Sequence, residues 1–510
     1  MRRIGIDVGG TNTDAVLVEN DRIVGSIKTP TTEDVMSGIA EALRQVLAKT
    51  KADPTSLDAV MIGTTHFTNA VAQRRDLTKV AAVRICLPAS ASLEPFIDWP
   101  QDLAELVRGE IVMLRGGHEY DGRPIAEFDE AGMRQAARRI DEAGFSACGV
   151  TSVFSPLTGE LEDRAAEILA EECPKVAVTL SNTLGRIGLL ERENATLLNA
   201  SLQVLAKKTT DAFTQAIASS GITAQLYLTQ NDGTVMLADV AEKFPVFSFA
   251  SGPTNSMRGA AFLSRMTDAM VVDVGGTTTD IGMLKAGFPR EANNVVEIGG
   301  VRTLFRMPDL LSIALGGGTL VGRDPLTIGP ESTGYQLTQR GLVFGGGELT
   351  ATDIAVASGL IDLGDRAKVA DLPGRIVDDT MKRMREMVAA AIDRMKTEAG
   401  DVPVVAVGGG AFLVPQSIAG VSEVIHVEHG EVANAVGAAI AQISGECDQI
   451  FQGMSREDVI AEARRIAEDR AVEAGADRAS LELVEVEDLP LAYMPGNSLR
   501  ARVRVVGAIA

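Results

Sequence analysis

Two octets of nearly identical sequence carry the residues in this chain that are best suited to chemistry. DVGGTNTD begins at Asp7 and DVGGTTTD begins at Asp273, and the two match at seven of eight positions. Each octet stands between two short apolar runs, which predicts two antiparallel strands joined by a tight turn. The glycines allow positive φ and close approach of a ligand, and the turn amides and threonine hydroxyls suit phosphate oxygens. The candidate phosphate-binding residues are Gly9, Gly10, Thr11, Asn12 and Thr13 in the first octet and Gly275, Gly276, Thr277 and Thr278 in the second.

Each octet also contains two carboxylates. Asp7 and Asp273 end the first strand of each pair, and Asp14 and Asp280 lie on the returning strand. Carboxylates beside a phosphate repel it unless a hard cation lies between them, so the pattern predicts Mg²⁺ at Asp7 and Asp273, held largely through water. Asp14 or Asp280 would position the attacking oxygen. One octet alone could be an ordinary Gly-Thr hairpin with capping aspartates, whereas two near-identical copies favour one nucleotide held from both sides.

A third glycine motif follows the second octet. In VPVVAVGGGAFLVP a buried-type strand runs into Gly408, Gly409 and Gly410, whose bare backbone would let an adenine or ribose lie flat against the turn. The chain contains neither G-x(4)-G-K-[ST] nor a clean G-x-G-x-x-G, so neither the P-loop nor the dinucleotide fingerprint applies. We also assign to the nucleotide site a triplet that lies between these motifs, Gly316, Gly317 and Gly318.

The elements that must position these motifs alternate between strand and helix patterns, which predicts an α/β protein. We expect a first lobe over residues 1–185, with an insertion at about 88–128, where no long periodic pattern occurs. A second lobe is expected over 186–450, and a small C-terminal tail of one helix and strands over 451–510. A small-residue helix, EVANAVGAAIAQI, is typical of close helix packing near the junction of two lobes.

Composition limits the setting and the partners. A chain of 510 residues with 45% apolar residues can fill two or more cores. The formal net charge of −21, without a Lys/Arg-rich tract, disfavours nucleic acid and anionic membranes as partners. Four cysteines without a C-x-x-C pair, no signal-peptide pattern and no unbroken run of eighteen apolar residues predict a cytoplasmic protein.

The order of the motifs resembles that of the actin, heat-shock chaperone and sugar-kinase superfamily of ATPases. Two hairpin phosphate loops followed by a strand ending in GGG carry this resemblance, which implies two RNase H-like domains around a nucleotide cleft, with ATP and Mg²⁺ as cofactors. The resemblance covers most of the chain.

A closer resemblance is to the hydantoinase A and 5-oxoprolinase family. IGIDVGGTNTDAVLV, GTTHFTNAVAQRR, ERENATLLNASL, ASGPTNS and DVGGTTTDIGML occur in the family's order over roughly the first 440 residues. The resemblance implies ATP-dependent opening of a cyclic amide or imide, often with a separately encoded hydantoinase B-like subunit. Related proteins include subunits of ATP-dependent ketone carboxylases. The substrate-site residues carried over by these motifs are Thr64, Thr65, Asn69 and Asp309.

The chain departs from the family's pattern in the substrate half. Ser312 stands at the family's histidine position in MPDLLSIALGGGT, and His66 and Phe67 interrupt the GTT-x-x-x-TN stretch. The large C-terminal domain of longer members corresponds here to a short tail. We therefore expect ATP handling to carry over, and ring opening to need a companion subunit that closes over the cleft.

Three functions follow as hypotheses. The first is a hydrolase that phosphorylates the carbonyl oxygen of a cyclic amide or imide, such as a hydantoin, 5-oxoproline or a lactam, so that water can open the ring. The second is a small-molecule kinase that leaves the phosphate on its product. The third is a non-catalytic ATP-driven switch or activator subunit, including a carboxylase-type subunit. Self-association into a homo-oligomer is left open.

Overall fold

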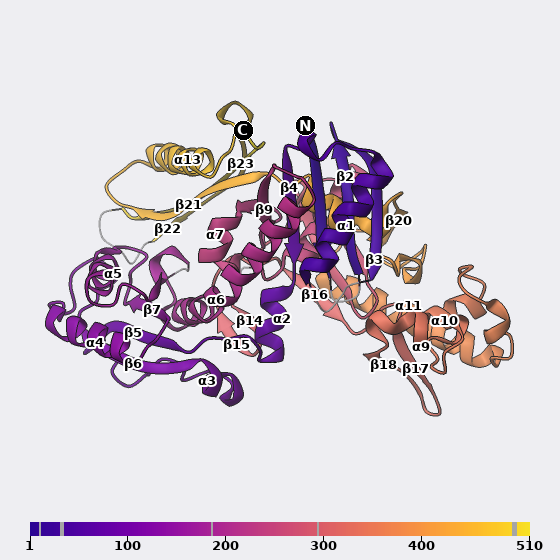
Figure 1. Cartoon of the computed structure of the whole chain (residues 1–510), viewed down its shortest axis with the longest axis horizontal. Helices are drawn as coiled ribbons and strands as arrows, with labels where there is room; N and C mark the ends of the chain where they lie inside the picture. Colours follow the sequence, from indigo (N-terminus) through magenta and orange to yellow (C-terminus); the bar gives the residue numbers. More distant parts are fainter. Residues whose placement is uncertain (10–11, 31–34, 185–186, 293–294, 492–496) are drawn as a thin grey trace.

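The computed structural model describes residues 1–9, 12–30, 35–184, 187–292, 295–491 and 497–510. The described chain forms several sheets, and Figure 1 shows the sheet that contains the N-terminal strands between two outlying parts. A purple domain that contains α4 and α5 lies at one end of the molecule, and an orange region with α9, α10 and α11 lies at the other. No helix among the described residues is both long enough and apolar enough to cross a membrane.

The first sheet holds the first octet. Among the described residues it has nine strands in the order β22-β23-β21-β10-β9-β4-β1-β2-β3. The helices α1 (Val35–Thr50), α6 (Leu189–Ser219) and α7 (Ala238–Lys243) share an apolar core with one face, and α13 (Arg456–Glu473) packs on β21 and β23. The strand bounds are β1 Arg2–Val8, β2 Asn12–Glu19, β3 Arg22–Pro30, β4 Ala59–Thr64, β9 Gln225–Thr229, β10 Val235–Leu237, β21 Ile443–Phe451, β22 Glu482–Pro490 and β23 Leu499–Gly507.

Strands from all three expected domain ranges meet in this first sheet. β1 to β4 come from 1–185, β9 and β10 from 186–450, and β22 and β23 from 451–510. The chain therefore leaves the first sheet and returns to it twice. The boundaries at 185/186 and 450/451 remain predictions about domain organisation.

The second sheet holds the second octet. Its described strands follow the order β13-β12-β11-β19-β20, with β16 paired to β12. The long amphipathic helix α11 (Gly374–Met395) and the short helix α10 (Ala351–Ala357) share its apolar core. The strand bounds are β11 Ala269–Val274, β12 Thr279–Lys285, β13 Phe288–Pro289, β16 Leu310–Ile313, β19 Val402–Val407 and β20 Val421–His426. Two small hairpins complete this half, β14 (Val296–Ile298) with β15 (Val301–Thr303) and β17 (Thr319–Arg323) with β18 (Leu326–Ser332), and α9 covers Leu337–Arg340.

A four-stranded domain with its own core interrupts the first sheet's sequence. Its described strands are parallel, in the order β6-β5-β7-β8, and α4 and α5 pack on them. The expected insertion at about 88–128 supplies α3 and β6, and the domain continues through Leu180. The bounds are β5 Val80–Leu87, α3 Gln101–Val107, β6 Arg108–Arg115, α4 Glu130–Glu142, β7 Ala147–Ser152, α5 Glu160–Glu172 and β8 Ala177–Leu180.

Two crossing helices join the sheets that carry the octets. α12 (Ala433–Ala439), from the small-residue stretch, packs on β1 and β2, while α8 (Ser251–Ser264) packs on β11 and β19. A Cβ added at Gly437 would lie 1.8 Å from the carbonyl oxygen of Asn255, and one at Gly259 would lie 1.9 Å from that of Ala433. Glycine is therefore required at this crossing, because any side chain would drive the helices apart.

Candidate functional site

The two octets form matching hairpins in the two sheets. Asp7 on β1 lies opposite Asp14 on β2, and Asp273 on β11 lies opposite Asp280 on β12. The turns close in the same way, since the Gly9 amide donates to the Asn12 carbonyl at 3.0 Å and the Gly275 amide donates to the Thr278 carbonyl at 2.9 Å. Gly10 and Thr11 lie outside the described residues. Of the remaining candidate phosphate-binding residues, Thr13 is buried, Gly276 is half-buried, and Thr277 and Thr278 are exposed at the turn.

The triplet Gly316–Gly318 supports the second turn from behind. The amides of Gly317 and Gly318 donate to the carbonyls of Gly275 and Gly276 at 3.0 and 2.7 Å. A Cβ at Gly316 would lie 2.6 Å from the Thr277 nitrogen, so this approach requires glycine. Two of its three amides thus hold the turn in place, and the assignment of the triplet to the nucleotide site stays a prediction.

The triplet Gly408–Gly410 lies against the other side of the same hairpin. It follows β19, which runs parallel to β11 with Val407 opposite Asp273. Gly408 has φ +86°, and a Cβ there would lie 2.3 Å from Asp273 Oδ1. The Gly410 amide donates to the Val274 carbonyl at 2.7 Å, whereas a Cβ at Gly409 would meet nothing within 4 Å. The second turn and the GGG turn thus form one continuous backbone surface.

Burial and crowding perturb the carboxylate pair of the first hairpin. Asp7 is almost completely buried, and burial, with the nearby charge of Asp14, raises its pKa to about 7. The Asn434 amide donates to Asp7 Oδ2 at 2.9 Å and to Asp14 Oδ2 at 3.1 Å. Lys28 on β3 forms an ion pair with Asp14 at 2.7 Å. Burial raises the pKa of Asp14 as well, and Lys28 opposes that shift.

The second pair is perturbed in the same direction. Burial raises the pKa of Asp273 to about 6; Ser256 opposes the shift by hydrogen bonding, and the charge of Asp280 adds to it. Charges of the first hairpin also reach Asp273, because Lys28 lowers its pKa and Asp14 raises it. Asp273 in turn contributes to the raised pKa of Asp7. The two hairpins therefore face each other closely enough for their carboxylates to interact.

Ser312 lies directly beside the second carboxylate pair. β16 pairs with β12 so that Ser312 stands opposite Asp280, and the Ser312 hydroxyl donates a short hydrogen bond to Asp280 Oδ1. Burial raises the pKa of Asp280, and this hydrogen bond opposes the shift. The position at which the sequence departs from its relatives thus contacts a candidate catalytic residue.

The proposed substrate residues fall into two groups. Thr64 lies opposite Val8 at the end of β4, and Ser251 of α8 donates to its carbonyl at 3.0 Å. Thr65 and Asn69 begin α2 (His66–Gln73), where the Asn69 amide donates to the Thr65 hydroxyl at 3.2 Å. These three residues share the sheet edge at which Asp7 lies. Asp309 does not join them. Its carboxylate pairs with Arg290 at 2.5 Å, and it directly precedes β16, whose residue Ser312 lies opposite Asp280.

Sequence reasoning missed four polar residues at this site: Lys28, Asn255, Ser256 and Asn434. Asn255 and Ser256 belong to the ASGPTNS stretch, and Asn434 belongs to the small-residue helix. The sequence marks both segments, but it does not predict that these side chains contact the carboxylates. Lys28 gives no signal in the sequence, because only the pairing of β3 with β2, which sets Lys28 opposite Asp14, brings it there.

A divalent cation is the group that the four carboxylates imply. Among the described residues, no three His, Cys, Asp or Glu side chains gather into a ready metal cage. Asp7 Oδ1 is buried and makes no hydrogen bond of ordinary geometry within the described chain. An orphaned carboxylate oxygen of this kind fits a water-ligated Mg²⁺, which takes one or two carboxylates and completes its shell with water and phosphate oxygens.

Comparison with known proteins identifies the sequence family. Residues 3–173 match the family model described as hydantoinase/oxoprolinase N-terminal region, and residues 192–395 match the model described as hydantoinase/oxoprolinase. The chain is 25% identical over 402 residues to the caprolactamase subunit alpha of Pseudomonas jessenii, covering 70% of this chain and 54% of that protein. It is 26% identical over 399 residues to the acetophenone carboxylase gamma subunit of Aromatoleum aromaticum, covering 70% and 53%. The chain therefore spans about half the length of these relatives.

Solved structures confirm the predicted two-lobed α/β fold class. The ATP-dependent caprolactamase from Pseudomonas jessenii superposes with a TM-score of 0.81 at 18% identity, over 100% of this chain and 88% of that one. Acetone carboxylase in its nucleotide-free form superposes with a TM-score of 0.70 at 18% identity, over the same shares.

Proposed function

Because this chain belongs to the hydantoinase/oxoprolinase family, we propose that it is the nucleotide-binding subunit of an ATP-dependent enzyme that opens a cyclic amide or imide. The observation that carries the proposal is the pair of facing hairpins, where the charge of Asp273 on the second hairpin interacts with those of Asp7 and Asp14 on the first. Phosphoryl transfer requires alignment and charge neutralisation rather than a protein nucleophile; the facing hairpins would supply the alignment, and a cation held by their carboxylates would supply the neutralisation.

The nucleotide would lie between the hairpins. Its phosphates would meet the turn at Gly9–Thr13 and the turn at Gly275–Thr278, and its adenosine would lie along the backbone of Gly408–Gly410, where a Cβ at Gly409 would meet nothing within 4 Å. Asp7 and Asp273 would hold Mg²⁺ largely through water, and Lys28 adds a positive charge beside Asp14. Mg²⁺ neutralises the charge that develops on the phosphate oxygens.

The chemistry begins with an amide carbonyl, which is a poor electrophile. The carbonyl oxygen attacks the γ-phosphorus of ATP, the bond to the β-phosphate oxygen breaks, and ADP leaves. Water then attacks the activated carbon, and the ring C–N bond breaks as the nitrogen takes up a proton, which leaves an acyl phosphate. A second water hydrolyses the acyl phosphate to the open-chain acid and phosphate. Asp280, held by Ser312, or Asp14, held by Lys28 and Asn434, would orient the attacking oxygen, and would take up the proton when that oxygen belongs to water.

A carboxylase-type subunit is the second candidate. The relatives and structural neighbours include acetophenone carboxylase and acetone carboxylase as well as caprolactamase. Both proposals share one step, in which a phosphoryl group is transferred to an oxygen atom derived from a carbonyl group. In the hydrolase this oxygen belongs to an amide, and in the carboxylase-type subunit it belongs to a ketone enolate. A small-molecule kinase differs from both because its product keeps the phosphate.

A companion subunit is part of the proposal. The caprolactamase and acetophenone carboxylase relatives are each named as a subunit. The hairpins and the GGG turn proposed to bind ATP lie within this chain, whereas Asp309 is paired with Arg290 and Ser312 stands where the family resemblance implies a histidine. We expect the lone chain to hydrolyse ATP slowly and to open rings only when a second, hydantoinase B-like subunit closes over the cleft.

The experiment purifies the chain alone and follows phosphate and ring-opened product together. Hydantoin, 5-oxoproline and simple lactams are assayed with Mg-ATP, against acetone or acetophenone with bicarbonate. Phosphate release that depends on a cyclic amide supports the hydrolase, and release that depends on a ketone supports the carboxylase-type subunit. Efficient, stoichiometric ring opening by the lone chain would contradict the need for a companion, and a phosphorylated final product would identify a kinase.

A further inference from the structure

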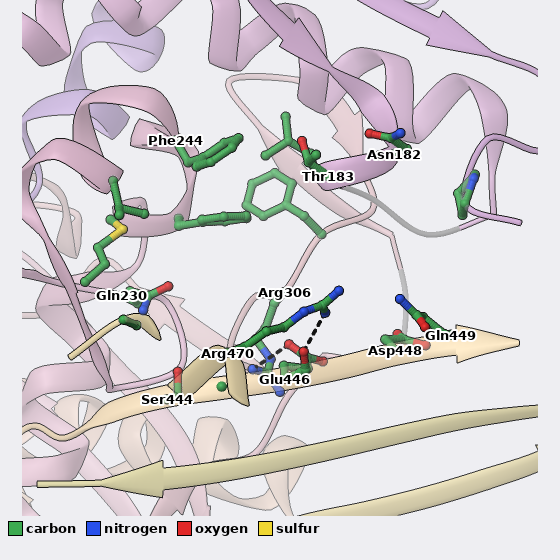
Figure 2. A pocket seen from close by; sticks show the side chains of 18 of the residues that line it. Asn182, Thr183, Gln230, Phe244, Arg306, Ser444, Glu446, Asp448, Gln449 and Arg470 are labelled. Atoms are coloured by element: carbon green, nitrogen blue, oxygen red, sulfur yellow. Dashed lines mark hydrogen bonds and ion pairs between the residues drawn. The ribbon is translucent and has the colours of Figure 1, made fainter. Parts of the chain in front are cut away.

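A large cavity lies away from the hairpins. It has a volume of about 890 Å³, within the range of small-molecule sites, and none of its lining residues belongs to either octet or to the glycine triplets assigned to the nucleotide. It forms where loops of the four-stranded domain meet the first sheet, between Asn182 and Thr183 on one side and β21 on the other (Figure 2). Domain junctions of this kind are a preferred location for ligand sites.

One wall of the cavity is aromatic. Phe244 and Phe247 lie with ring centroids 5.5 Å apart, and Phe305 adds a third ring that packs on Phe249 at 6.0 Å. Phe244 faces the cavity from the side opposite β21 (Figure 2). Three aromatic side chains on one wall favour a ligand with an apolar, preferably flat, body.

The acidic floor is already neutralised. Glu446 on β21 pairs with Arg306 at 2.9 Å and with Arg502 at 3.1 Å, and Asp448 pairs with Arg500 at 2.5 Å. Asp232, which is buried, pairs with Arg306 at 3.1 Å. A cationic ligand would have to displace an arginine from one of these acids, so the floor offers little to a positive charge.

Arg470 is the cation that these acids leave uncommitted. It extends from α13 over Glu446 into the cavity (Figure 2), where its Nη1 donates to the Glu446 carbonyl oxygen at 2.7 Å. Within the described chain, no carboxylate lies at ion-pair distance from Arg470. A guanidinium has five N–H donors in a planar fork that matches a carboxylate, so four donors and a full charge remain for a ligand.

The cavity therefore presents an aromatic wall and a guanidinium with no carboxylate partner among the described residues.

We propose that this cavity binds a small organic acid with an apolar ring, independently of the nucleotide. The carboxylate pairs with Arg470, and the ring lies against Phe244, Phe247 and Phe305. This inference goes beyond the proposed function, since it concerns a second site and requires no particular reaction at the hairpins.

The test is calorimetric titration of the full chain with hippurate (N-benzoylglycine), which carries a carboxylate and an aromatic ring. Hippurate should bind saturably, and its uncharged amide should bind more weakly. Arg470→Gln should weaken hippurate binding about tenfold or more, because the charge-assisted pair is lost. Arg464→Gln is the matched control, since Arg464 also lies exposed on α13 but contacts Glu468 and does not line the cavity.

Two further measurements test whether hippurate binding is independent of the nucleotide site. Saturating Mg-ATP should leave hippurate affinity unchanged, and Asp7→Asn should retain full hippurate binding. Absence of saturable binding, equal binding by Arg470→Gln and the parent, or displacement of hippurate by Mg-ATP would each overturn the proposal. None of these outcomes depends on ring opening, so they are distinguishable from a failure of the proposed function.

Discussion

Asp7 links the stability of the protein to its proposed chemistry. Its carboxylate is buried, lies near Asp14 and Asp273, and has its pKa raised to about 7. Between about pH 4 and pH 7 the folded chain keeps this proton while the unfolded chain loses it, so ionisation of Asp7 lowers stability as pH rises through that window. A divalent cation between the hairpins would reverse this cost, because it binds the ionised form.

We therefore predict opposite effects of Asp7→Asn on stability and on turnover. The variant should be more stable than the parent at pH 8 without nucleotide, by roughly 1–3 kcal/mol, and this advantage should shrink as pH falls toward 4. ATP turnover should fall by about a hundredfold or more, because charge is removed from the metal site. Denaturant unfolding at pH 5 and pH 8 and a phosphate-release assay measure the two effects.

The matched control for this prediction is Asp393→Asn, which changes an exposed aspartate on α11. It should alter neither quantity. Near-normal ATP turnover in Asp7→Asn would contradict the prediction and would indicate that the octets are ordinary hairpins without a role in catalysis.

A single hydrogen bond from Ser312 lowers the pKa of Asp280 and so opposes the effect of burial. Ser312→Ala removes the donor, so the pKa of Asp280 should rise further above its ordinary value. If ionised Asp280 orients the attacking oxygen, the acidic limb of the pH profile of ATP turnover should move to higher pH while KM for ATP stays unchanged. Ser332→Ala is a suitable comparison, since Ser332 contacts the second turn at the Gly276 carbonyl without touching Asp280. An unmoved acidic limb would exclude Asp280 from this role.

At the scale of elements, the crossing of α8 and α12 determines how the two hairpins face each other. α12 rests on β1, where a Cβ at Gly5 would lie 2.1 Å from the Ala435 carbonyl, and α8 rests on β12, where Gly282 meets the Met257 side chain. The same helices carry Asn434 and Ser256, which bond the first and second carboxylate pairs. Displacement of this crossing would therefore change both the angle between the sheets and the carboxylate environments.

Gly437→Ala tests this element directly. Its Cβ would lie 1.8 Å from a backbone oxygen that cannot rotate away, so we expect destabilisation of about 1–3 kcal/mol and a weaker response to Mg-ATP. Thermal unfolding with and without Mg-ATP measures both. Gly374→Ala at the start of α11 is the control, because a Cβ there meets nothing within 4 Å. Unchanged unfolding of Gly437→Ala would show that the helices can separate freely.

At the scale of the whole molecule, nucleotide binding should stabilise the fold and depend on pH. A ligand held by both sheets adds about 2.7 kcal/mol at a hundredfold excess over its Kd. Because Asp7 and Asp273 hold their protons up to about pH 7 and about pH 6, the Mg²⁺-dependent part of this stabilisation should be larger at pH 8 than at pH 5.5. Thermal scans with Mg-ATP, and with ATP plus a chelator, check this. An equal shift with and without Mg²⁺ would contradict the assignment of the carboxylates.

Local sequence was sufficient for the parts of the site built from neighbouring residues. The two hairpins, with Asp7 opposite Asp14 and Asp273 opposite Asp280, follow from apolar runs around a glycine turn. Turn chemistry acts over a few residues, so the sequence carries it in full. The family was also recognisable, because its motifs occur in order along the chain.

Only the tertiary structure decided which distant residues meet. Lys28 reaches Asp14 through the register of β2 and β3, Ser312 reaches Asp280 through β12 and β16, and Asn434 spans the first carboxylate pair although it lies more than four hundred residues along the chain. Arg470 and Asn182 lie across one cavity from helix α13 and the four-stranded domain. These meetings depend on sheet order, helix crossing and burial, which arise from the packing of whole elements, so no local pattern in the sequence encodes them.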